Sequence, residues 1–153
     1  SNADNRDTLA GIVEALVGCG RQVVFPLHPR TEKNLQAFGL WDELAAKVKV
    51  LPPVDYLDFL GSLMAAAQVL TDSGGVQKEA YFFAKPCVTL REETEWTELV
   101  EHGCNLIAGT EPGRIFGGYR TMRKAGIDFG EDLYGGGKAA ARVVEALKLH
   151  EPS

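Results

Sequence analysis

The stretch 69–80, VLTDSGGVQKEA, joins a short apolar run to a segment with helical spacing. Its first three residues favour a strand, and the residues from Gly75 onward favour a helix. Gly74 and Gly75 lie at the join, where the absence of Cβ atoms lets an anion approach the N–H groups of a helix N-terminus. Ser73 adds a hydroxyl that can donate to a phosphate oxygen. The pattern predicts a phosphate-binding turn, although the same residues would also suit a helix cap and a tight turn with no ligand.

The alternation of strand and helix at this join continues along the chain. Apolar runs rich in Val, Ile and Leu predict strands at 22–27, 48–51, 68–71, 87–90 and 105–108. Amphipathic segments predict helices at 4–16, 31–38, 56–67, 75–83, 95–101, 112–122 and 138–149. Near-continuous apolar strands separated by helices indicate a parallel sheet covered on both faces. The sequence therefore predicts an α/β fold with a doubly wound parallel sheet, a Rossmann-like arrangement.

The length of 153 residues fits one domain. Residues 1–3, Ser-Asn-Ala, have the form of a scar left by tag removal, so we expect residues 4–153 to form a single native domain. Helical spacing begins at once, with no strand before it, and this suggests a segment cut from a longer protein. Residues 117–137 are Gly-rich and poorly patterned. The helix after them is expected to face a core with its apolar residues, Val143, Val144 and Leu147, and to reach beyond this domain.

Composition disfavours several classes of protein. The formal net charge of −5 argues against sequence-independent binding of nucleic acid, which depends on clustered Lys and Arg. No apolar run approaches the ~20 residues that span a bilayer and no signal peptide is recognisable, so we expect a soluble, cytoplasmic protein with no membrane partner. The three cysteines, Cys19, Cys87 and Cys104, form no C-x-x-C pair, which favours buried free thiols. We expect neither a metal ion nor a cofactor.

Two further residues are expected at the carboxyl edge of the sheet, beside the phosphate turn. His28 and Arg30 follow the strand at 22–27, and Pro29 keeps His28 extended. A histidine there can hydrogen-bond to a bound anion, whereas the alternative is a ring that only closes the strand through a backbone hydrogen bond. Because ligands of doubly wound sheets bind outside the carboxyl ends of the strands, we predict that both residues line the site.

Three more residues are candidates for contact with a ligand. Glu79 lies one to two turns into the helix after the glycines and can accept from a sugar hydroxyl, although an exposed helical acid would look the same. Phe59 could stack on a base or pack in the core. Arg91 opens the charged loop 91–96, REETEW, which either faces a ligand or is the solvated start of a helix.

Two common nucleotide-binding fingerprints are not met. The run 135–138, GGGK, looks like part of a Walker A loop, but Ala139 replaces the required Ser or Thr and no strand precedes it. A G-x-G-x-x-G dinucleotide motif is absent. The sequence therefore supports neither a P-loop ATPase nor a dehydrogenase.

Four blocks of sequence carry a family resemblance, namely 28–29 (HP), 70–80, 85–86 (KP) and 90–96. Taken in order, they resemble the non-hydrolysing UDP-N-acetylglucosamine 2-epimerase family, and the D-S-G-G-x-Q-x-E run is far more specific with the others than alone. The resemblance covers nearly the whole native chain. It implies a GT-B architecture, with two Rossmann-like halves and the active site between them. This chain would be the C-terminal half, which holds the UDP.

The resemblance also implies roles for individual residues. They are Ser73, Gly74 and Gly75 at the diphosphate, Glu79 at the ribose hydroxyls, Phe59 near the uracil, and His28 beside the diphosphate and the reacting sugar. The implied reaction removes a proton from C2 as UDP is eliminated, and re-addition to the glycal-like intermediate inverts C2. His28 would be catalytic, because a cationic or hydrogen-bonding group stabilises charge on the departing UDP. In the family, the carboxylates that move the C2 proton belong to the other half, so this chain alone is expected to bind without turnover.

Two departures from the family pattern bear on the ligand. Trp96 gives T-E-W where many relatives acting on UDP-N-acetylglucosamine have T-E-R, and this form looks more like relatives that act on a diacetamido uronic acid. Val54 removes one possible contact to the base. We expect the full-length protein to be a homodimeric epimerase that serves surface polysaccharide synthesis. Two other hypotheses stay open, the donor-binding half of a GT-B glycosyltransferase and a nucleotide-binding module without catalysis.

Overall fold

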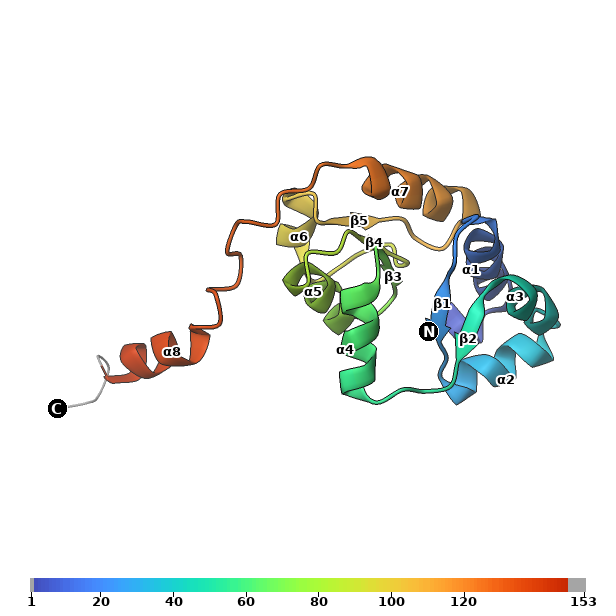
Figure 1. Cartoon of the computed structure of the whole chain (residues 1–153), viewed down its shortest axis with the longest axis horizontal. Helices are drawn as coiled ribbons and strands as arrows, with labels where there is room; N and C mark the ends of the chain where they lie inside the picture. Colours follow the sequence, from blue (N-terminus) through green and yellow to red (C-terminus); the bar gives the residue numbers. More distant parts are fainter. Residues whose placement is uncertain (1, 149–153) are drawn as a thin grey trace.

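The computed structural model describes residues 2–148 as short strands that alternate with helices (Figure 1). The strands are β1 (Val24–Pro26), β2 (Lys49–Leu51), β3 (Val69–Thr71), β4 (Cys87–Thr89) and β5 (Asn105–Ile107). The helices are η1 (Asn2–Asp4, a 3₁₀ turn), α1 (Arg6–Gly18), α2 (Pro29–Ala37), α3 (Trp41–Lys47), α4 (Tyr56–Ala65), α5 (Gly74–Phe82), α6 (Thr97–Glu101), α7 (Pro112–Lys124) and α8 (Ala139–Lys148). Every predicted strand and helix is present, and Leu149, the predicted end of the last helix, lies outside the described residues.

The strands form two parallel sheets. β1 pairs with β2, while β3, β4 and β5 form a second sheet in that order. Helices connect consecutive strands, as parallel neighbours require. The predicted α/β class with parallel strands is confirmed. The sheet is not continuous, however, because no strand pairing within residues 2–148 joins β1 or β2 to the other three strands.

One hydrophobic core connects the two sheets. It combines the apolar face of α1 with residues such as Leu27, after β1, and Val88, in β4. The residues predicted to form the buried face of the first helix are all buried, namely Leu9, Ile12, Val13 and Leu16. The sequence pattern did not predict α3, which buries only Leu44 in seven residues. One buried position is too few to show a helical period.

A smaller apolar cluster packs α4 and α5 against β3 and β4. Its buried members are Leu63, Val69, Ala80 and Cys87, with Phe59 partly buried beside them. All three cysteines are buried and free, as predicted. Burial raises the pKa of the Cys87 thiol to about 12, so this thiol stays protonated and unreactive near neutral pH. Among the described helices, none has both the length and the apolar character needed to cross a membrane.

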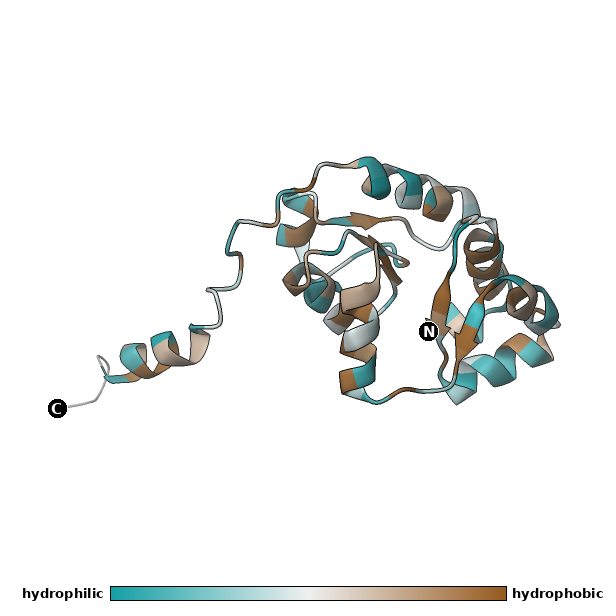
Figure 2. Cartoon of the chain, in the orientation of Figure 1, coloured by the Kyte–Doolittle hydropathy of each residue, from teal (hydrophilic) through white to brown (hydrophobic). Residues whose placement is uncertain are grey.

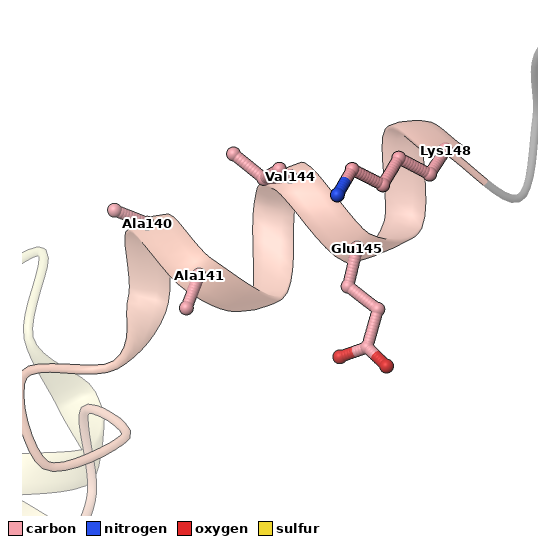
Figure 3. A pocket seen from close by; sticks show the side chains of 5 residues that line it. All are labelled: Ala140, Ala141, Val144, Glu145 and Lys148. Carbon is pink, nitrogen blue, oxygen red and sulfur yellow. The ribbon is translucent and has the colours of Figure 1, made fainter.

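The last helix, α8, lies apart from the rest of the domain, beyond an extended Gly-rich segment (Figure 1). Its apolar side chains, Val143, Val144 and Leu147, are 57%, 51% and 65% exposed. Within residues 2–148 these side chains therefore face no core, contrary to the prediction, because periodicity identifies an apolar face but not what covers it. The helix does extend away from the domain, which is the other part of the prediction (Figure 1). Figure 2 shows brown, apolar positions on this isolated helix, and Figure 3 shows the side chains of Ala140, Ala141, Val144, Glu145 and Lys148, all on α8, that line an open hollow.

Candidate functional site

The predicted phosphate turn lies where β3 meets α5. Ser73 is the N-cap residue, with extended backbone (φ −88°, ψ 127°), but its side chain makes no capping hydrogen bond among residues 2–148. Its N–H donates to Thr71 Oγ1 over 3.0 Å. Ser73 and Gly75 are exposed, and no described atom lies within 4 Å of where a Cβ on Gly75 would stand. The turn thus presents the Ser73 hydroxyl and the first N–H groups of α5 on an open surface.

Gly74, unlike Gly75, has close neighbours in the loop after β4. A Cβ on Gly74 would collide with the carboxylate of Glu95, and Trp96 Nε1 donates to Gly74 O over 2.8 Å. Glu95 also pairs with Arg91, with 2.9 Å between Oε2 and Nη1. The loop after β4 therefore packs directly on the first turn of α5. A side chain at Gly74 would displace the Glu95 carboxylate whether or not an anion binds, and Arg91 lies close to the turn through its partner Glu95.

A buried polar network holds this arrangement in place. Gln77 is fully buried, and its Oε1 accepts from Thr94 Oγ1 (2.5 Å) and from Asn105 Nδ2 (2.9 Å). Its Nε2 donates to Ser73 O over 3.4 Å. Asn105 Oδ1 in turn accepts from Thr89 Oγ1 over 2.9 Å. One amide thus ties the phosphate turn to β4, β5 and the 91–96 loop. Sequence reasoning missed Gln77, although its spacing places it on the same helical face as the apolar Ala80.

Glu79 lies beside the start of α4. Tyr56 Oη donates to Glu79 Oε1 over 2.9 Å, and this hydrogen bond is the main reason that the pKa of Tyr56 is raised. Phe59, almost one turn further along α4, lines an open hollow of about 400 Å³ together with His28. The full lining is Pro26, Leu27, His28, Pro53, Val54, Asp55, Tyr56 and Phe59. The fold therefore brings Phe59 and His28 to one hollow, and Tyr56 connects that hollow to Glu79.

His28 lies two residues after β1 and is the N-cap residue of α2, with extended backbone (φ −71°, ψ 141°). Its Nδ1 accepts from Arg30 N over 3.2 Å, and the side chain is otherwise exposed. Because Nδ1 is the acceptor, the neutral ring carries its proton on Nε2, which can then donate to a ligand. Both readings of His28 are thus compatible with the fold, since one ring nitrogen caps the helix and the other is available.

Arg30 points elsewhere. Its guanidinium lies 2.7 Å from Asp4 Oδ1, so it contacts the N-terminal turn instead of the phosphate turn. Arg30 lies in the first turn of α2, just beyond the carboxyl end of β1, where the sequence predicted it. The direction of its side chain is decided by Asp4, which is 26 residues away in the chain and which the strand pattern could not relate to it.

An aromatic cluster supports the 91–96 loop from the other side. Lys78 Nζ lies 4.3 Å from the ring centre of Trp96 and 4.1 Å from that of Tyr134. Tyr134 Oη donates to Glu98 Oε1 over 2.7 Å, and this bond holds the pKa of Glu98 below its usual value. Sequence reasoning missed Lys78 and Tyr134, since Tyr134 comes from the Gly-rich segment that carries no pattern.

A parallel α/β domain whose strands alternate with helices, with an exposed turn at the carboxyl end of β3, is of the Rossmann-like class. Within that class, the chain belongs to the UDP-N-acetylglucosamine 2-epimerase family, whose pattern it matches over residues 1–148. The chain is 45% identical to UDP-2,3-diacetamido-2,3-dideoxy-D-glucuronate 2-epimerase of Pseudomonas aeruginosa over 95% of its length. It is 38% identical to UDP-N-acetylglucosamine 2-epimerase of Methanocaldococcus jannaschii, again over 95%.

Solved structures agree with these relatives. The structure of the Methanocaldococcus jannaschii enzyme superposes with a TM-score of 0.87 at 37% identity, covering 97% of this chain and 43% of that one. A second structure of that enzyme, in complex with UDP-GlcNAc and UDP, gives a TM-score of 0.85. The chain covers only 41% of the length of either curated relative. The predicted family and the prediction of a half-length domain within it are thus confirmed.

Proposed function

We propose that this chain is the UDP-binding half of a UDP-sugar 2-epimerase, and that the whole protein inverts C2 of a UDP-linked amino sugar. The observation that carries the proposal is the turn at Ser73–Gly75, in which Ser73 and Gly75 are exposed and the Ser73 hydroxyl caps no helix N–H group among residues 2–148. Such a helix N-terminus suits the diphosphate of a nucleotide sugar. Membership of the epimerase family favours this function over a glycosyltransferase or a module without catalysis.

The remaining predicted contacts fit one extended ligand. With the diphosphate on the turn, Glu79 accepts from the ribose hydroxyls and its partner Tyr56 orients the carboxylate. The uracil then enters the hollow beside Phe59. Arg91 and Arg30 supply positive charge, Arg91 by leaving Glu95 and Arg30 by leaving Asp4.

His28 is the residue of this chain that we assign to catalysis. Breaking the bond between the sugar and UDP develops negative charge on a phosphate oxygen. A donor already fixed by its own hydrogen bond, as His28 is through Nδ1, stabilises that charge without reorganising. The groups that move the C2 proton are expected in the other half of the protein, so this chain should bind UDP without turning over substrate.

The substrate we propose is a UDP-linked diacetamido uronic acid. Trp96 replaces the arginine expected for UDP-N-acetylglucosamine, and the 45% identical relative is a 2-epimerase of a diacetamido glucuronate. Trp96 is also fixed at the turn by its bond to Gly74 O, so it lies beside the region where the ligand would bind. The cytoplasmic location, the homodimer and the role in surface polysaccharide synthesis remain predictions from the sequence.

Two measurements test the proposal. Calorimetric titration of the 153-residue chain with UDP should give weak binding, and Ser73→Ala should weaken it while leaving the melting temperature unchanged, because the hydroxyl caps nothing in the described chain. Product analysis of the full-length protein with a panel of UDP-sugars should give C2 inversion, fastest with the diacetamido uronate. Binding of UDP that Ser73→Ala leaves intact, or transfer of the sugar to an acceptor, would contradict the proposal.

A further inference from the structure

The indole of Trp96 lies against the first turn of α5, and the residue is fixed at both ends. Its Nε1–H donates to Gly74 O over 2.8 Å, and its backbone N–H donates to Thr94 Oγ1 over 3.1 Å. The side chain is partly buried, so water competes less for the indole bond than it would at an exposed site. Trp96 therefore meets Gly74 in one defined orientation.

The bond to Gly74 O acts on the peptide unit that joins Gly74 to Gly75. A planar trans peptide carries the C=O of one residue and the N–H of the next on opposite sides. In this unit the oxygen accepts from the indole, and the N–H is one of the first in α5, which have no partner within the helix. Hydrogen bonds in such a chain polarise one another, so a donor on Gly74 O makes Gly75 N–H a stronger donor.

Lys78 lies one helical turn after Gly74, on the same face of α5. Its Nζ lies 4.3 Å from the centre of the Trp96 ring and 4.1 Å from that of Tyr134, within the limit of about 6 Å for a cation–π contact. The two rings meet edge to face, with their centroids 6.3 Å apart and their planes at 89°. The ammonium is thus held against both rings, over the same indole that bonds to Gly74.

Tyr134, the second ring, is anchored to two helices. Its Oη donates to Glu98 Oε1 on α6 over 2.7 Å, and the N–H of its neighbour Leu133 donates to Tyr81 Oη on α5 over 3.3 Å. The Gly-rich segment therefore provides a fixed wall for the ammonium, although it forms neither helix nor strand at this point.

The charge of Lys78 differs from that of the arginines considered for the site. Arg91 and Arg30 each pair with a carboxylate of this chain, at 2.9 Å and 2.7 Å. Lys78 forms no ion pair among residues 2–148. It is also partly buried, and a partly desolvated cation acts more strongly on an aromatic ring than an exposed one does. Its charge is therefore available to act on the indole.

We propose that Lys78 strengthens the ligand-binding turn through Trp96, as a positioning residue that does not itself touch the diphosphate. The ammonium draws electron density from the indole and strengthens its Nε1–H as a donor. That donor polarises the peptide between Gly74 and Gly75, whose N–H then binds an anion more tightly. The inference rests on the proposed function, since the anion is the diphosphate of the UDP-sugar. Lys78 thus supplies from behind the turn the positive charge that a P-loop lysine brings directly to phosphate.

A double-mutant cycle in the 153-residue chain, measured by calorimetric titration with UDP, tests the proposal. Lys78→Met removes the charge and keeps a long side chain, and it should weaken binding about fivefold. Trp96→Phe removes the indole N–H and keeps an aromatic ring, and it should weaken binding by a similar factor. The double variant should bind no more weakly than Trp96→Phe, because the lysine then has no indole N–H to act on.

Two further variants serve as controls. Lys78→Arg keeps a cation that stacks on aromatic rings, so its UDP affinity should stay within about twofold of that of the natural chain. Lys47→Met removes the same charge from an exposed position at the end of α3 and should leave the affinity unchanged.

A second measurement needs no ligand. The chain has two tryptophans, so its proton NMR spectrum should contain two indole N–H resonances, with Trp41 on α3 as the internal reference. Lys78→Met should move the Trp96 resonance upfield, as expected for a weaker hydrogen bond, and should leave that of Trp41 in place.

Four outcomes would overturn the proposal. Losses of affinity that add in the double variant would mean that Lys78 attracts the anion directly. A lower melting temperature with unchanged UDP affinity would give Lys78 a structural role only. An unmoved Trp96 resonance in Lys78→Met would show that the ammonium does not act on the indole. If the natural chain binds no UDP, the proposed function fails as well, whereas binding that Ser73→Ala weakens and Lys78→Met does not would remove this inference alone.

Discussion

The helices α5 and α7 begin in nearly the same way and differ in what satisfies their first N–H groups. Each has an extended N-cap residue and a glycine at its second position, Gly75 in α5 and Gly113 in α7. In α7, the N-cap Glu111 accepts from Gly113 N (3.0 Å) and Arg114 N (2.8 Å). In α5, the N-cap Ser73 makes no such bond in the described chain.

The comparison separates a helix start that supports the fold from one that is free for a ligand. Glu111 provides a carboxylate of its own to α7, and these bonds hold its pKa below the usual range. The N-terminus of α5 has the same dipole but leaves its donors on an open surface. The difference lies in the cap residue, since a glutamate can reach the second and third N–H groups while the serine hydroxyl here does not.

The largest effect is expected at a third helix start, that of α2. In the full-length protein, His28→Ala should lower kcat by ~10²–10³, because it removes a donor from the departing UDP. It should also lower stability by about 1 kcal/mol through the lost cap. His28→Asn should restore the melting temperature but not kcat, since asparagine caps helices well. If His28→Asn restores kcat per folded molecule, His28 serves only to cap α2 after β1 and has no catalytic role.

A pair of matched substitutions tests the comparison directly. Gly75→Val in the 153-residue chain should weaken UDP binding by roughly 100-fold, since it blocks two or more charge-assisted hydrogen bonds, while open space around Gly75 lets the fold survive. Gly113→Val should do the reverse, because its Cβ would stand 3.2 Å from Glu111 Oε1 and disturb the cap. Calorimetry measures the UDP affinity of each variant, and thermal melts measure its stability.

Equal losses of affinity in Gly75→Val and Gly113→Val would remove the distinction between the two helix starts. Gly74→Val is a poorer probe, since it also collides with Glu95.

Glu79 should contribute binding energy without contributing to the chemical step. In the full-length protein, Glu79→Gln loses a charge-assisted hydrogen bond to a ribose hydroxyl, a loss of about 1.5–3 kcal/mol. Because this bond is equally strong in the ground state and the transition state, KM should rise more than kcat falls. Tyr56→Phe, which removes only the partner of Glu79, should give a smaller effect in the same direction. Steady-state kinetics in which kcat falls more than KM rises would make Glu79 a catalytic residue.

The smallest expected effect is a pH dependence confined to α7. The pKa of Glu111 is lowered in the folded state, so its contribution to stability is present above the unfolded pKa, near 4.5, and is lost as pH falls through the lower folded value. Melting curves from pH 6 down to about pH 3 should fall more steeply for the natural chain than for Glu111→Gln. UDP affinity at pH 7 should be the same for both. Identical slopes would mean that the cap contributes nothing to stability.

Much of this architecture could be predicted from local sequence. The strands before Ser73 and His28 were found because apolar runs and bounding polar residues depend only on neighbours in the chain. The buried face of α1 followed from its helical period. The D-S-G-G-x-Q-x-E run located the junction between β3 and α5, because the residue types at a strand–helix junction are set by backbone geometry that a short stretch specifies by itself. Together with the other three blocks, the same run indicated the family by resemblance, and the family is confirmed.

What could not be predicted depends on residues far apart in sequence. The role of Gln77 requires Thr94 and Asn105, and the direction of Arg30 requires Asp4. The adjacent glycines Gly74 and Gly75 look alike in the sequence but have different surroundings in the fold. Glu95 packs on Gly74, whereas no described atom lies within 4 Å of where a Cβ on Gly75 would stand.

The sequence by itself determined the parallel α/β class, the order of its elements and the place of the Ser73–Gly75 turn between β3 and α5, because periodicity and turn chemistry are local properties of the chain. Only the tertiary structure decided which cap residue is satisfied, which way each charged side chain points and where the sheet is interrupted between β1 and β3. Those properties are set by contacts between segments that folding brings together. The hydrogen bonds and ion pairs concerned exist only once both partners are in place.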